Sequence, residues 1–201
     1  MISVEEALDK ILSNISVLEA ERKPILESLG QVLAEDVYSD IDIPPLDNSA
    51  MDGYAVQWES IRGANSSQPK VLEIIGEVAA GYISSQEVTP GTAIRIMTGA
   101  PVPAGADTIV PFEDTDEEVR KAAGQSLDEI GILLEVAKGS NIRRAGEDVA
   151  RGSLVLAKEA MLRPQEIGVL ASLGRAEALV IRRPVIAILA TGDELVDVGQ
   201  S

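Results

Sequence analysis

The order of the hydrophobic patterns along this chain is the feature that most constrains its fold. Residues 3–15 place apolar side chains at helical spacing behind a capping box formed by Ser3 and Glu6. Between residues 71 and 136 the pattern changes to short strands separated by Gly and Pro. Residues 163–173 then return to a helical pattern. Because the chain ends of an inserted domain usually lie close together, this order predicts a discontinuous domain interrupted by a β-rich insertion.

The expected fold class is α+β and mostly β. The chain has 201 residues, of which 45% are hydrophobic, enough for one sizeable core or two small ones. We expect a small discontinuous α/β scaffold domain at 1–45 and 142–182, and an inserted β-rich domain at 46–141. Residues 183–201 are expected to begin a truncated α/β domain, because the aliphatic run 185–189 is typical of a strand buried in a parallel sheet.

Local patterns give further expectations. Residues 32–37 are expected to form one or two helical turns, whereas residues 114–129 are rich in charged side chains and are interpreted as a solvated loop of little functional weight. The strands expected from alternation and β-branched content are 71–75, 78–80, 93–97, 108–112, 132–136 and 154–156.

Charge and residue usage exclude several classes of function. The 33 acidic and 17 basic residues give a formal charge of −16, which disfavours binding to nucleic acid or to an anionic membrane. The chain has no Cys and no His, so its chemistry must use carboxylates, hydroxyls, backbone amides, Arg or Lys. Neither a signal peptide nor a membrane span is apparent, and the cytoplasm is the expected location.

The first of four polar motifs is DNSAMDGYA, residues 47–55, which follows two prolines. Its carboxylates, amide and hydroxyl could bind a cation or a polar substrate. The alternative is an ordinary turn, in which Asp47 and Asn48 bond to their own backbone and Asp52 with Gly53 supplies the bend. Local chemistry alone favours the turn.

Two more motifs follow. Residues 95–103, RIMTGAPVP, carry a strand into a rigid loop with a free hydroxyl at Thr98, although the same pattern suits a simple strand connection. Residues 141–148, NIRRAGED, place Arg143 and Arg144 in an acidic protein, where they could bind a phosphate or carboxylate. Equally, the two arginines could pair with nearby acidic side chains at the surface.

The fourth motif, ATGDEL at residues 190–195, follows the predicted strand 185–189. Ligands of open α/β sheets bind beyond the carboxyl ends of strands, and carboxylates there suit magnesium or a phosphate-bearing substrate bridged by it. The alternative is a helix start, with Thr191 or Asp193 as the N-cap and Glu194 favourable to the helix dipole.

The four motifs, in this order and at these separations, resemble the molybdopterin molybdenumtransferases, the MoeA family that includes the E domain of gephyrin. The resemblance implies the family's first two domains and the opening strand of its molybdopterin-binding domain. It also implies a magnesium-dependent enzyme of molybdenum cofactor biosynthesis, which transfers molybdenum from molybdate to adenylated molybdopterin and releases AMP. A homodimer is expected, with no nucleic-acid or membrane partner, and the fragment alone is expected to be inactive.

The resemblance also assigns roles to single residues. The positions that match the family's active site are Asp52, Thr98, Asp148 and Glu194, and Glu194 is the candidate magnesium ligand. The expected substrate-binding residues are Ser49, Arg143, Arg144, Thr191 and Asp193. An alternative function is a dimerising scaffold of gephyrin type without transferase activity.

Overall fold

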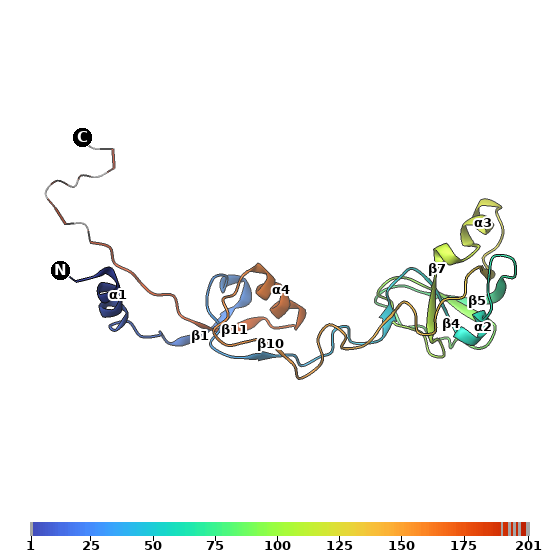
Figure 1. The fold of residues 1–201 in the computed structure, drawn as a ribbon, viewed down its shortest axis with the longest axis horizontal. Coiled ribbons are helices and arrows are strands. Elements are labelled where there is room, and N and C mark those ends of the chain that lie inside the picture. The colour runs from blue at the N-terminus through green and yellow to red at the C-terminus, as the bar shows by residue number, and fades with distance from the viewer. Residues whose placement is uncertain (1, 190, 193, 195, 197, 200–201) are drawn as a thin grey trace. The chain divides into compact units, whose positions relative to one another are not determined.

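The computed structural model describes residues 2–189, 191, 192, 194, 196, 198 and 199. The chain forms two compact units (Figure 1). Unit 1 comprises Met1–Val37 and Leu154–Ser201, and unit 2 comprises Tyr38–Ser153. Unit 1 is therefore built from two separate stretches of chain, and the expected boundaries near residues 45 and 141 lie inside unit 2. More residues are in strands than in helices, so the predicted mostly β class is confirmed.

Unit 1 pairs the two stretches of chain through an antiparallel ribbon. Strand β1 runs beside strand β11, from Ala20 opposite Ile181 to Pro24 opposite Glu177, and Figure 1 shows these blue and orange segments side by side. The elements of unit 1 are α1 (Val4–Leu12), β1 (Ala20–Pro24), the 3-10 turn η1 (Ile25–Glu27), β10 (Leu154–Leu156), α4 (Pro164–Ser172) and β11 (Glu177–Ile181). Strand β2 (Val37–Tyr38) pairs with β10 where unit 1 ends.

Helices α1 and α4 begin where the sequence predicts. In α1 the Glu6 amide donates to the Ser3 hydroxyl and the Ser3 amide donates to the Glu6 carboxylate, both at 3.1 Å. Among the described residues, no helix is long and apolar enough to cross a membrane.

The helical turns expected at residues 32–37 are absent from the structure. Instead, Val32 is bridged to Met161 and Leu33 to Val180, residues 34 and 35 form a bend, and Val37 begins β2. Leu33 is fully buried in the core of unit 1, where it packs with Leu162, Leu170 and Val180, among others. The expectation was wrong because backbone pairing with distant residues outweighs a weak local helical pattern.

Residues 185–189, expected to begin a truncated domain, form no strand in the structure, and their large apolar side chains are exposed. A strand requires a neighbour to accept its backbone hydrogen bonds. No strand among the described residues pairs with this run.

Unit 2 is built around a five-stranded sheet with the order β7-β4-β6-β5-β8. Strands β5 and β6 are parallel, and the other neighbours are antiparallel. The predicted strand 71–75 lies within β5, which continues to Val78, whereas residues 79 and 80 of the strand expected at 78–80 lie outside it. The strand expected at 132–136 lies earlier, as β8. The elements of unit 2 are β3 (Asn48–Ser49), β4 (Gly53–Val56), α2 (Trp58–Ile61), β5 (Lys70–Val78), β6 (Thr92–Ile96), β7 (Thr108–Pro111), the 3-10 turn η2 (Phe112–Asp114), α3 (Glu117–Ala122), β8 (Glu129–Ile132) and β9 (Ile142–Arg143).

Strand β4 is buried on both of its faces. Tyr54 and Val56 belong to one hydrophobic cluster, and Ala55 belongs to another. The local sequence favoured a turn here, with Asp52 and Gly53 supplying the bend. Its pairing with β6 and β7 on either side makes it a strand.

Gly53 begins β4 because the neighbouring strand approaches it closely. A Cβ atom added at this position would lie 2.1 Å from the carbonyl oxygen of Val110 and 2.9 Å from the Cα of Pro111, both in β7. Backbone atoms cannot move aside without breaking the sheet pairing. The glycine of the MDG triplet is therefore required by packing.

We predict that Gly53→Ala destabilises unit 2 by about 2 kcal/mol, since the added methyl group forces β4 away from β7. Chemical denaturation followed by the single tryptophan, Trp58, measures this change, because Trp58 packs against the core of unit 2. Gly168→Ala is the matched control. It adds the same methyl group in α4, where nothing lies within 4 Å, and Ala is favoured over Gly in a helix. Equal stability of Gly53→Ala and wild type would contradict the packing role.

Candidate active site

Three of the four polar motifs meet at one place in unit 2 through backbone hydrogen bonds. The Gly99 amide donates to the Ser49 carbonyl at 2.8 Å, and the Ser49 amide donates to the Ala100 carbonyl at 3.0 Å. The Ala50 amide donates to the Asn141 carbonyl at 2.9 Å, and β3 pairs with β9. Segments far apart in the sequence thus form one cluster of loops.

The central contact of this cluster joins Asp52 to Thr98. One carboxylate oxygen of Asp52 accepts hydrogen bonds from both the backbone amide and the hydroxyl of Thr98, each at 2.7 Å. These two hydrogen bonds, with the nearby positive charge of Arg95, hold the pKa of Asp52 below its ordinary value. Both side chains are exposed, so an ionised, oriented carboxylate faces solvent here.

The expected arginines pair with acidic side chains in the same loops. Arg143 contacts both carboxylate oxygens of Asp148, at 2.6 and 2.7 Å. Arg144 pairs with Asp47, whose pKa is lowered by the Ala145 amide first and by Arg144 next. The surface-pairing alternative therefore describes the structure. Because 40% of the Arg143 side chain and 62% of the Arg144 side chain are exposed, an anionic ligand could still reach both.

Two polar residues of the motifs shape the loops. The Ser49 side chain is buried, and its hydroxyl donates to the Met51 carbonyl and accepts from the Met51 amide. Asn141 has a left-handed backbone, with φ of 60°, which Asn tolerates better than most residues. Its side chain donates to the Ile109 carbonyl at 3.0 Å. The structure thus directs the Ser49 hydroxyl into the turn, although a substrate contact was expected.

The fourth motif belongs to unit 1, whereas the other three belong to unit 2. Thr191 and Glu194 are exposed there, and Asp193 lies outside the described residues. The described residues contain no group of three acidic side chains suited to a metal ion. Glu194 offers one carboxylate, which fits magnesium chemically, since this ion takes few protein ligands and completes its shell with water and substrate phosphates.

Sequence reasoning missed a buried charged cluster beside this site. Glu117 was assigned to a loop of little weight, but it lies in α3 and its side chain is only 2% exposed. It accepts hydrogen bonds from Tyr54 at 2.6 Å and from Arg95 at 3.1 Å, and it also pairs with Lys121. Burial raises the pKa of Glu117, but these three hydrogen bonds outweigh burial and lower it. The sequence signal was an i,i+4 pair, Glu117 with Lys121.

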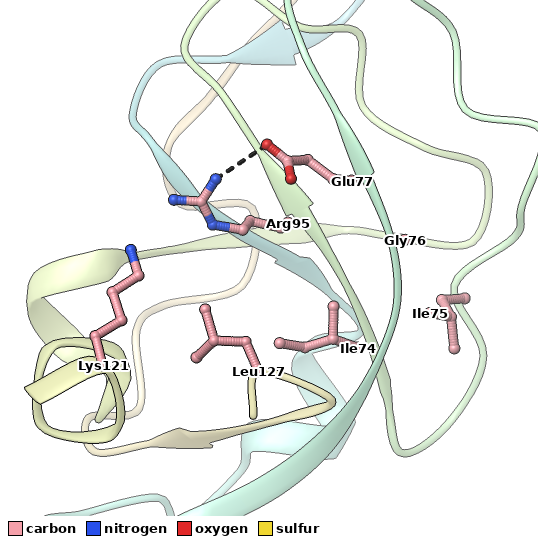
Figure 2. A pocket seen from close by; sticks show the side chains of 7 residues that line it. All are labelled: Ile74, Ile75, Gly76, Glu77, Arg95, Lys121 and Leu127. Carbon is pink, nitrogen blue, oxygen red and sulfur yellow. Dashed lines mark hydrogen bonds and ion pairs between the residues drawn. The ribbon is translucent and has the colours of Figure 1, made fainter. Parts of the chain in front are cut away.

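A pocket of about 550 Å³ lies beside the same cluster (Figure 2). Arg95, Lys121 and Glu77 supply its charged side chains, and Arg95 donates to Glu77 at 3.0 Å. None of the expected site residues lines it. We place the candidate site at the Asp52–Thr98 pair, because three of the motif loops meet there.

We predict that Thr98→Val raises the pKa of Asp52 toward its ordinary value, because the hydroxyl donor is lost while the backbone donor remains. Titration of the Asp52 carboxyl carbon by NMR measures the shift. The folded pKa lies below the unfolded one, so the carboxylate stabilises the fold above about pH 4 and this contribution disappears as the pH falls through the folded pKa. Thr89→Val is the control and should leave Asp52 unchanged. An unaltered Asp52 pKa in Thr98→Val would contradict the hydrogen bond.

Comparison with known proteins agrees with the resemblance seen in the motifs. The family described as MoeA N-terminal region (domain I and II) matches residues 2–174. The chain is 39% identical over 199 residues to molybdopterin molybdenumtransferase 2 of Mycobacterium tuberculosis (strain CDC 1551 / Oshkosh), covering 99% of this chain and 47% of the relative. It is 38% identical over 197 residues to molybdopterin molybdenumtransferase of Staphylococcus aureus (strain MRSA252), covering 98% and 45%.

Solved structures give the same result. The molybdopterin biosynthesis moeA protein from Pyrococcus horikoshii OT3 superimposes with a TM-score of 0.81 at 38% identity, covering 92% of this chain and 47% of that one. The chain thus spans about half the length of the relatives it matches. Since the family match extends over most of its residues, this chain belongs to the MoeA family and corresponds to its N-terminal region.

Proposed function

We propose that the full-length protein containing this sequence transfers molybdenum from molybdate to adenylated molybdopterin, with release of AMP, in molybdenum cofactor biosynthesis. The observation that carries the proposal is the Asp52–Thr98 pair, at the meeting point of three motif loops. Relatives named molybdopterin molybdenumtransferase support it.

The residues of the site suit an anionic substrate. Asp52 is kept ionised and oriented by Thr98, so it can accept a hydrogen bond or a proton at one carboxylate oxygen. In the free protein Asp148 holds Arg143 and Asp47 holds Arg144, and both arginines are positioned to exchange these acidic partners for oxyanions of the substrate when it binds. Glu194 is the proposed magnesium ligand. When bound, this ion would neutralise phosphate charge and so favour departure of AMP.

The proposed assembly is a cytoplasmic homodimer, and no nucleic acid or membrane is involved. Glu194 supplies a single carboxylate, and its motif lies in a different unit from the Asp52–Thr98 pair. The proposal therefore requires groups from the rest of the full-length protein, or from a second copy, to complete the site. We propose that this chain by itself does not turn over substrate.

We predict that Asp52→Asn in the full-length protein lowers the rate of AMP release from adenylated molybdopterin by about 100-fold. The amide oxygen can still accept from Thr98, so the free energy of unfolding should change by no more than about 0.5 kcal/mol. The assay contains molybdate and magnesium, and released AMP is measured by chromatography.

Asp114→Asn, a change of the same kind elsewhere in unit 2, is the control and should leave AMP release at the wild-type rate. No AMP release by the wild-type protein would contradict the proposed function. If that protein nevertheless dimerised and failed to restore cofactor synthesis to a deficient strain, the gephyrin-type scaffold would be favoured. A large loss of stability in Asp52→Asn would indicate that Asp52 only shapes the turn.

A further inference from the structure

A buried carboxylate from α3 bridges side chains of two neighbouring strands of the unit 2 sheet. The Glu117 side chain is 2% exposed, and one of its oxygens accepts the Tyr54 hydroxyl while the other accepts Arg95 and Lys121. Tyr54 belongs to β4 and is fully buried, whereas Arg95 belongs to β6. A buried carboxylate is costly unless its oxygens are satisfied, and here each has a donor.

The two strand partners of Glu117 stand directly opposite each other. Tyr54 pairs with Arg95 in the register of β4 and β6, and Gly53 pairs with Ile96. One residue before Gly53 is Asp52, and two residues after Ile96 is Thr98. Glu117 therefore bridges β4 and β6 close to the point where the two strands deliver the Asp52–Thr98 pair.

A second route leads from Arg95 to the backbone of Asp52. The guanidinium carbon of Arg95 lies 4.4 Å from the ring centroid of Phe112, and this ring also packs edge-on against Tyr54 at 5.5 Å. The Phe112 amide donates to the Asp52 carbonyl at 3.2 Å. Arg95, which Glu117 holds, therefore contacts Phe112, and Phe112 is hydrogen-bonded to the backbone of Asp52.

The alternative interpretation is that Glu117 only attaches α3 to the sheet. Helix α3 already has other attachments, because the Leu133 amide donates to the Asp114 carbonyl at 2.8 Å and the Gly131 amide donates to the Asp116 carboxylate at 2.8 Å. Asp114 and Asp116 lie just before α3, so these contacts attach the start of the helix to Gly131 of β8 and to Leu133, which follows β8. Attachment of the helix therefore does not require the buried Glu117 carboxylate to bridge side chains of β4 and β6.

We infer that Glu117 is a positioning residue for the Asp52–Thr98 pair, acting through Tyr54 and Arg95 to hold the ends of β4 and β6 in register. Its importance for turnover rests on the proposed function, but its effect on the geometry of the pair does not. Glu117 acts on the pair indirectly, through strands β4 and β6 and through the Phe112 ring that Tyr54 and Arg95 both contact.

The test is amide hydrogen exchange of Thr98, measured by NMR on this chain, because the Thr98 amide is the donor that Asp52 accepts. Glu117→Gln keeps the size of the side chain but removes its charge, so we expect Thr98 to exchange about tenfold faster as its hydrogen bond opens more often. Tyr54→Phe removes one donor from the same bridge and should also accelerate Thr98 exchange. Glu118→Gln, the adjacent and exposed position of α3, is the matched control and should leave Thr98 exchange unchanged.

The variants also separate positioning from attachment of α3. Faster exchange in α3 with wild-type exchange at Thr98, in either Glu117→Gln or Tyr54→Phe, would overturn the inference. If Glu117→Gln does not fold, Tyr54→Phe decides the question in the same way. In the full-length protein, Glu117→Gln should lower kcat for AMP release with little change in KM. Absence of AMP release in wild type would count against the proposed function, whereas the exchange result would still decide the role of Glu117.

Discussion

The pairing of β4 with both β6 and β7 is the interaction on which the rest of unit 2 depends. This four-residue strand is buried on both faces, so it contributes to two hydrophobic clusters at once. Its first residue, Gly53, must be glycine because a Cβ atom at this position would clash with the backbone of β7. Asp52 immediately precedes this strand, and the close packing of β4 therefore fixes the position of the Asp52 carboxylate.

Backbone hydrogen bonds hold the polar loops of the site together, so the side chains of Asp52 and Thr98 are available for other contacts. Ser49, Gly99 and Asn141 use their main-chain groups to join three segments. Asp52 and Thr98 then meet at the surface, where their polar atoms face solvent while remaining oriented. Such an arrangement reduces the reorganisation that a reacting site must undergo.

Charge in this acidic protein is distributed unevenly between surface and interior. Arg143 and Arg144 form exposed pairs, whose contribution to stability is small and which a ligand can replace. Glu117 and Arg95 form a mostly buried pair, for which the loss of one partner leaves a charge without compensation. The exposed pairs of Arg143 and Arg144 suit binding, and the mostly buried pair of Glu117 and Arg95 suits maintenance of the site's geometry.

The sequence by itself determined the mostly β class, the capping box of α1, helix α4, the main strands of the sheet and the family to which the chain belongs. These features follow from local periodicity or from motifs that keep their order. The tertiary structure decided that GYAV is a strand, that residues 32–37 form no helix, that residues 185–189 form no strand, and that Glu117 is buried. Three of these depend on partners distant in the sequence: GYAV on backbone groups in β6 and β7, residues 32–37 on Met161 and Val180, and Glu117 on the side chains of Tyr54 and Arg95. Residues 185–189 have no such partner among the described residues. A local pattern cannot reveal such partners, because hydrogen bonding and burial are set by what the folded chain brings alongside.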